Sequence, residues 1–113
     1  MSQVISKYAT VLLAAADADK TLVAAPDAGS GLSIYVQAIH WSIAIAAAQR
    51  TKVGKVGGTD AQQLLDFAAS ASGVGTRRFG GNGWKMPAET ALGADPAAAG
   101  PEIAFIVEYN VAL

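Results

Sequence analysis

The chain has 113 residues, of which 52% are hydrophobic and only 15% are charged, and its formal net charge is −1. This length is that of one domain. Ordinary domains carry roughly 25% charged residues, so we expect parts of this charge-poor surface to be covered by neighbouring chains. The charge balance offers neither the basic face that nucleic acid requires nor a polybasic signal for membranes. The absence of cysteine excludes disulfides, thiolate zinc sites and cysteine nucleophiles.

The N-terminal part of the chain gives one ambiguous segment and one short strand. The segment "YATVLLAAA" is ambiguous because alanine and leucine favour helix. We assign residues 1–18 to an N-terminal arm or edge segment and residues 19–113 to a β-sandwich domain. Residues 20–25, "KTLVAA", predict a strand that ends at the turn "PDAGSG".

Residues 31–45 predict a long strand that is apolar on both faces, because β-branched and aromatic side chains suit a pleated, half-buried surface. The apolar residues keep one parity up to Ala38 and take the other from Ile39 onward. Such a switch requires one extra residue, so we expect a β-bulge or bend near residues 38–40. A membrane span is excluded, because the apolar run at 32–48 is shorter than about 20 residues and contains polar side chains.

The rest of the chain predicts short strands and one clear long one. Residues 50–56 alternate polar and apolar, residues 61–69 fit a helical turn or a strand, residues 76–86 predict strand, glycine turn and strand, and residues 89–94 predict a short strand. In "EIAFIVEYNVAL" every second residue from Ile103 to Leu113 is apolar, which predicts a half-buried strand. The fold class is therefore all-β: a single-domain β-sandwich or jelly roll of about seven to eight short antiparallel strands.

His40, the chain's only histidine, stands next to Trp41. A catalytic triad needs a base, a nucleophile and an orienting acid within hydrogen-bond reach, and neither Ser33 nor Ser42 lies in a nucleophile-elbow motif. We interpret His40 as a structural residue of a packed strand. A metal site on a threefold axis, with one His40 from each of three subunits, stays open as an alternative.

The glycine-rich segment "GVGTRRFGGNG", residues 73–83, matches no phosphate-binding motif. On a strand, its adjacent arginines would point to opposite faces. One interpretation is a turn-forming loop with two solubilising arginines. The other is a contact loop, because arginine and aromatic residues are enriched at interfaces. The second interpretation gives Arg77, Arg78, Phe79 and Trp84 as partner-contact residues. We take the N-terminal segment, including Tyr8, as a further contact region.

The carboxylates are scattered through predicted loops and form neither a calcium-loop motif nor an acid–base pair. We therefore expect a protein that is not an enzyme and that uses no cofactor and no metal. The abundance of small side chains and the low charge point instead to association with other protein chains.

The order of segments resembles a class of small virion structural proteins of tailed phages, the capsid decoration (cement) or head-fibre β-sandwich type. The resemblance covers about residues 20–113 and is carried by "IYVQAIHWSIAIAAAQRTKVGKVGG", "FGGNGWKMPAETALGA" and "AFIVEYNVAL". In that class a Gly-Trp turn is followed by a strand, and a terminal strand closes the sandwich. The counterparts in this sequence are Gly83–Trp84, Glu89–Leu92 and Val107–Tyr109.

This resemblance implies a protein made in the host cytoplasm and carried on the capsid surface, where it bridges neighbouring major capsid subunits. It also implies a homo-oligomer, with a trimer favoured. Two alternatives stay open: a tail or head–tail connector component, and a carbohydrate-binding sandwich in which Trp41 or Trp84 stacks on the sugar.

Overall fold

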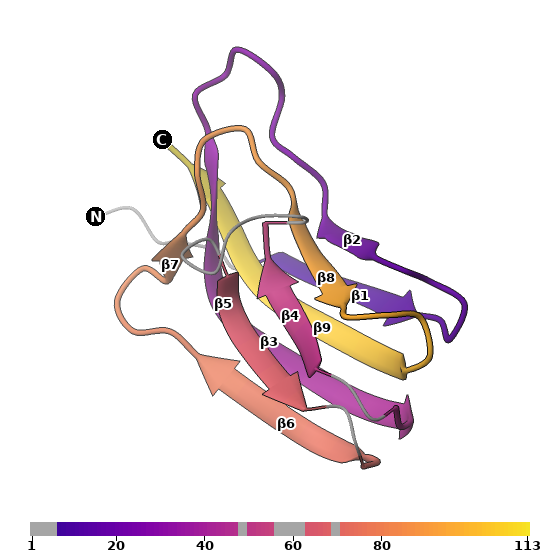
Figure 1. The fold of residues 1–113 in the computed structure, drawn as a ribbon. Coiled ribbons are helices and arrows are strands. Elements are labelled where there is room, and N and C mark those ends of the chain that lie inside the picture. The colour runs from indigo at the N-terminus through magenta and orange to yellow at the C-terminus, as the bar shows by residue number, and fades with distance from the viewer. Residues whose placement is uncertain (1–6, 48–49, 56–62, 69–70) are drawn as a thin grey trace.

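The computed structural model describes residues 7–47, 50–55, 63–68 and 71–113, which form two antiparallel sheets packed face to face (Figure 1). Sheet A has the order β1-β9-β3-β6, with β7 also paired to β3, and sheet B has the order β2-β8-β4-β5. The strands are β1 (Lys7–Leu13), β2 (Lys20–Val23), β3 (Ser33–Ile45), β4 (Arg50–Gly54), β5 (Gln63–Ala68), β6 (Gly73–Arg78), β7 (Trp84–Lys85), β8 (Leu92–Pro96) and β9 (Glu102–Ala112). The predicted all-β sandwich is confirmed. In the described ranges, no helix has the length and apolar character needed to cross a membrane.

The core lies between the two sheets and is built from alternate residues of their strands. On β9 the side chains of Ile103, Phe105 and Val107 are fully buried, whereas Ala104 and Ile106 between them are exposed. β-strand geometry points successive side chains to opposite faces, so the alternation of the sequence places one face of β9 against sheet B. The predicted C-terminal strand is confirmed.

The bulge expected in β3 is present, one residue before the expected range. The register with β9 shifts between Val36, which lies opposite Tyr109, and Ala38, which lies opposite Glu108. The extra residue is therefore Gln37. Because of it, Ile34 and Val36 before the bulge and Ile39 after it all face the core and are fully buried.

An aromatic contact joins the two sheets near the middle of β3. The ring of Trp41 on sheet A stacks on Phe67 of β5 on sheet B, with ring centroids 4.7 Å apart and an angle of 16° between the planes. Phe67 in turn meets the edge of Phe105 at 6.5 Å. Trp41 therefore packs between the sheets, on the opposite face of β3 from His40.

Two segments that the sequence left ambiguous form strands. β1 pairs with β9 along its whole length, from Lys7 opposite Tyr109 to Leu13 opposite Ile103, and forms one edge of sheet A. β5 pairs with β4, and so forms one edge of sheet B. Residues 1–6 of the predicted N-terminal arm, and residues 61, 62 and 69 of the predicted 61–69 element, lie outside the described residues.

The strand predicted at 89–94 is displaced, because β8 begins only at Leu92. Glu89 has a φ of 57°, a left-handed conformation that a strand cannot contain. Its carboxylate accepts hydrogen bonds from the backbone N–H groups of Gly29 (2.6 Å) and Gly31 (3.0 Å), and its own N–H donates to the carbonyl of Leu32 (2.8 Å). Glu89 therefore holds the loop after β2 against the turn before β8.

Candidate contact surface

The face of sheet A that points away from sheet B carries residues from β1, β9, β3 and β6. The pairing registers arrange these residues in rows across the sheet. We call them the outward face, and its rows are Tyr8–Glu108–Ala38–Arg78, Thr10–Ile106–His40–Thr76 and Leu12–Ala104–Ser42–Val74.

Large apolar side chains are exposed on the outward face. The exposed fraction is 84% for Val74, 66% for Tyr8, 50% for Leu12 and 43% for Ile106. A shallow hollow between β3, β6 and β9 runs past Val74 and Ile106 and is bordered by Ala104. Several large apolar side chains exposed on one face are a feature of interaction sites.

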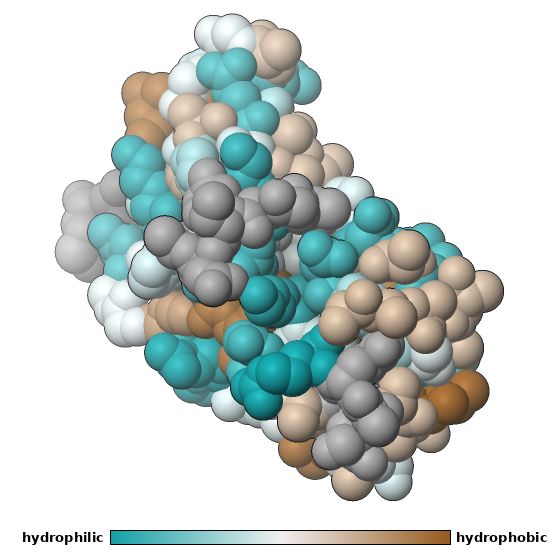
Figure 2. All heavy atoms as spheres, viewed as in Figure 1, coloured by the Kyte–Doolittle hydropathy of each residue, from teal (hydrophilic) through white to brown (hydrophobic). Residues whose placement is uncertain are grey.

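The opposite side of the molecule has a different character. Charged residues of β4 and β5 lie on the outer side of sheet B, where Nε of Arg50 lies 2.8 Å from Oδ1 of Asp66. Figure 2 shows hydrophilic residues gathered in the middle of this view, around β4 and β5. The two outer surfaces of the sandwich therefore differ, and the apolar one belongs to sheet A.

His40 stands at the centre of a polar cluster on the outward face. Its Nδ1 lies 3.0 Å from Oγ1 of Thr76 and its Nε2 lies 2.7 Å from Oε2 of Glu108. Arg78 approaches the same Oε2 with its Nη1 at 3.7 Å. Ala38 lies between Arg78 and Glu108 in their row and is fully buried, as expected if these longer side chains pass over it.

This cluster engages both ring nitrogens of His40 within the chain. In this arrangement neither nitrogen is available to a metal on a threefold axis. Among the residues that the structure describes, no group of three or more histidine, cysteine, aspartate or glutamate side chains could hold a metal ion.

The contacts Thr76–His40–Glu108 also have the connectivity of a hydroxyl, an imidazole and a carboxylate in a hydrolase triad. A triad works with preorganised hydrogen-bond donors in a site that excludes water. Here Thr76 is exposed on the open face of an edge strand. We interpret the cluster as a structural one, whose contacts hold the polar side chains of the outward face in place.

The predicted contact residues divide into two places. Tyr8 and Arg78 belong to the same row of the outward face. Arg77 points to the other side of β6, as adjacent residues on a strand must, and its guanidinium lies 5.4 Å from the ring centroid of Phe79. The ring centroids of Phe79 and Trp84 lie 6.4 Å apart. The second place is thus an aromatic cluster at the edge of the sandwich.

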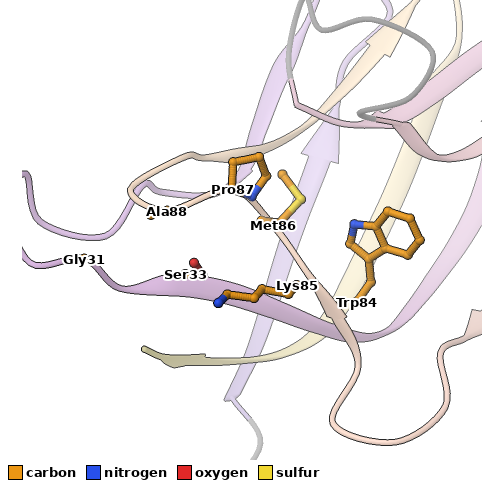
Figure 3. A pocket seen from close by; sticks show the side chains of 7 residues that line it. All are labelled: Gly31, Ser33, Trp84, Lys85, Met86, Pro87 and Ala88. Carbon is orange, nitrogen blue, oxygen red and sulfur yellow. The ribbon is translucent and has the colours of Figure 1, made fainter.

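Trp84 borders a hollow at the end of sheet A (Figure 3). The lining also includes Lys85, Met86 and Ser33, and the Ser33 hydroxyl is buried without a hydrogen-bond partner in the described part of the chain. Figure 3 shows the Trp84 ring and the Lys85 side chain on different sides of the β7 segment. Trp84 is 44% exposed, whereas Trp41 is stacked between the sheets. Of the two tryptophans considered for sugar stacking, Trp84 is the one at the surface.

Sequence reasoning missed most of the outward face. Leu12, Val74 and Ile106 were not singled out, and Thr76 and Glu108 were not connected with His40. The signal was present for β9, where Ile106 is a large apolar residue on the otherwise more polar parity of the strand. The partners of His40 lie 36 and 68 residues away in the sequence, so only the strand order reveals them.

Comparison with known proteins gives little. No family model and no curated protein matches the chain. Among solved structures, a chain of the "Cyanophage Pam1 capsid asymmetric unit" is similar, with a TM-score of 0.45 and 18% identity, over 94% of this chain and 83% of that chain. A likeness this remote carries no argument about function.

Proposed function

We propose that this chain is a non-enzymatic virion structural protein that decorates a bacteriophage capsid and bridges neighbouring major capsid subunits. The outward face of sheet A is the surface that contacts the capsid. The observation that carries the proposal is the exposure of Tyr8, Leu12, Val74 and Ile106 on that one face.

The construction of this face supports a role in association. Its apolar side chains surround a polar cluster whose members are already bonded to one another, through the contacts of His40 with Thr76 and Glu108. A partner can therefore bury the face with few polar groups left unsatisfied, which keeps the desolvation penalty small. Interfaces commonly combine apolar contacts with a smaller number of hydrogen-bonded polar groups.

The physical effect on the capsid is stabilisation by mass action. A protein that binds the assembled shell, and not its separated subunits, shifts the equilibrium toward the shell. The sequence resemblance described above supports this class of protein. The cyanophage chain belongs to the same kind of particle, but its remote likeness adds no support.

Co-sedimentation with capsids tests the proposal. Purified protein is mixed with shells of the source phage that lack it, and the bound copies per particle are counted. Decoration predicts hundreds of copies per shell and a higher temperature of shell disassembly. A few copies per particle would favour the tail or head–tail connector alternative, and no binding would contradict a capsid role.

A carbohydrate-binding module is the second candidate, because the Trp84 ring is partly exposed beside a hollow. An exposed aromatic ring suits stacking on a sugar, but sugar recognition also needs convergent polar groups, and Lys85 leaves the strand on the other side of the backbone. Binding on a glycan array that disappears in Trp84→Ala would favour this function over decoration.

A further inference from the structure

Among the described residues, no strand lies beside the outer edge of β6. In the described part of the chain β6 pairs with β3 alone, and it lies at the edge of sheet A (Figure 1). Natural proteins protect such edges with proline, bulges or charges. β6 contains no proline, its register with β3 is unbroken from Ala38–Arg78 to Ile43–Gly73, and its charges lie at one end only.

The hydrogen bonding of β6 to β3 determines which backbone groups are free. The N–H of Phe79 donates to the carbonyl of Gln37 at 3.0 Å, so Arg78 and Ala38 between them form a non-hydrogen-bonded pair. The antiparallel alternation gives Thr76 and Val74 the same status. The backbone N–H and C=O groups of Val74, Thr76 and Arg78 therefore point away from β3. The short contact between the side chains of Thr76 and His40 agrees, since side chains lie closest in such pairs.

We propose that β6 pairs antiparallel with β6 of a second copy of this chain, around a twofold axis at Thr76. The two A sheets then form one continuous sheet. In this register Thr76 lies opposite Thr76 of the second copy, and Val74 lies opposite Arg78. Each of the three residues with free backbone groups gains hydrogen bonds to the other copy.

The charges and side-chain sizes of β6 complement one another in this register. Arg77 lies opposite Gly75 of the second copy, so the long side chain meets a residue that has none. The arginine pairs of the two copies lie at opposite ends of the shared ladder. A parallel arrangement would place like charges next to one another, which destabilises a strand pair. Because both charges of β6 lie at its C-terminal end, an antiparallel second copy is favoured over a parallel one.

The pairing has a consequence for the outward face. Residues opposite one another in an antiparallel ladder point to the same side of the sheet, so the two outward faces lie on one side of the dimer. Two equivalent faces on one side are what a bridge between neighbouring capsid subunits needs. This consequence rests on the proposed function, whereas the pairing does not. The twofold dimer replaces the trimer that the sequence resemblance implies.

Cysteine cross-linking tests the register directly, because the chain has no cysteine of its own. Opposite residues in a hydrogen-bonded antiparallel pair have Cα atoms about 5.5 Å apart, which suits a disulfide. Thr76→Cys should form a covalent dimer readily under mild oxidation. The matched control is Val74→Cys, which is also exposed on the same strand but lies two residues from the axis and should cross-link far less.

The native mass, measured by light scattering, is the second test of the dimer. The wild type should have twice the chain mass of 11.4 kDa. Thr76→Pro removes the edge N–H that the second copy needs and should be monomeric, whereas Thr76→Val keeps that N–H and should stay dimeric. Proline is tolerated where the N–H of an edge strand faces solvent, and circular dichroism checks that the sandwich is intact.

Two results would overturn the proposal. The first is a wild-type monomer or trimer. The second is a dimer in which Thr76→Cys cross-links no better than Val74→Cys. A special case of the first result is a wild-type monomer whose binding to capsid shells is lost in Thr76→Pro, which would mean that the edge of β6 pairs with a strand of a capsid protein. In that case the proposed decoration function would stand without the dimer.

Discussion

Gly75 of β6 lies directly opposite Trp41 of β3, and a Cβ atom at Gly75 would lie 2.2 Å from Cζ2 of the indole. The indole occupies this position while it stacks on Phe67 of the other sheet. Gly75 is therefore required by the packing between the sheets.

Gly75→Ala should destabilise the protein, because the new methyl group overlaps an indole that cannot move without breaking its stack. Overpacking of this kind costs about 1–3 kcal/mol. The free energy of unfolding from urea titration measures it. Gly80→Ala is the control, since nothing lies within 4 Å of a Cβ there, and its effect should stay within about 0.5 kcal/mol. Equal effects of the two substitutions would contradict this packing.

Glu89 supplies a second prediction, because its carboxylate holds two backbone N–H groups of the loop after β2 while its backbone has a positive φ. Glu89→Ala should destabilise the protein by about 1–3 kcal/mol, since it removes charge-assisted hydrogen bonds. Glu89→Gly removes the same bonds but relieves the left-handed backbone. It should therefore be the less destabilising of the two.

Hydrogen exchange provides the matching local measurement for Glu89. The amides of Gly29 and Gly31 should exchange faster in both variants than in the wild type. Unchanged protection at these two amides would show that the carboxylate does not hold the loop.

Glu108→Ala should weaken the polar cluster of the outward face, because His40 and Arg78 both lose the oxygen they approach. The Glu108 side chain is only 18% exposed, so we expect a loss of about 1–3 kcal/mol in unfolding free energy. Glu102→Ala on the same strand is the control. If thermal unfolding shifts equally for both, the cluster contributes nothing specific.

The interpretation of Thr76–His40–Glu108 as a fixed surface cluster predicts no hydrolase activity that depends on Thr76. Hydrolysis of 4-nitrophenyl acetate by the wild type and by Thr76→Val should proceed at the same rate. Removing the nucleophile of a working triad abolishes most of its catalysis. A large fall in the rate for Thr76→Val would therefore assign the cluster an enzymatic role.

How much could be predicted from the sequence depended on how local each feature is. The strand at β9 and the parity switch in β3 are local patterns, and both were predicted to within one residue of the observed bulge at Gln37. The start of β8 was missed because the conformation of Glu89 depends on bonds to Gly29 and Gly31, about 60 residues away. β1 was ambiguous because its partner is the last strand of the chain.

The contact surface was harder to predict from the sequence than the strands, because it is assembled from distant segments. Tyr8 and Arg78 were both chosen from the sequence, but their common row depends on the order β1-β9-β3-β6. Composition favoured residues 73–83 as a contact loop, whereas the first part of this segment is the strand β6, which contributes Val74 and Arg78 to the outward face. Strand order depends on which distant segments pair, and the local patterns of a single sequence do not determine it.

The most direct test of the contact surface is the binding of Ile106→Asp to capsid shells that lack the protein. Ile106 lies at the centre of the outward face and is 43% exposed, so a charge there should disturb the interface and leave the core intact. Leu113→Asp is the control, because Leu113 is 79% exposed but lies outside that face. We predict that Ile106→Asp fails to co-sediment with shells while Leu113→Asp binds as the wild type does. Full binding by a correctly folded Ile106→Asp variant would contradict the assignment of sheet A as the capsid-binding surface.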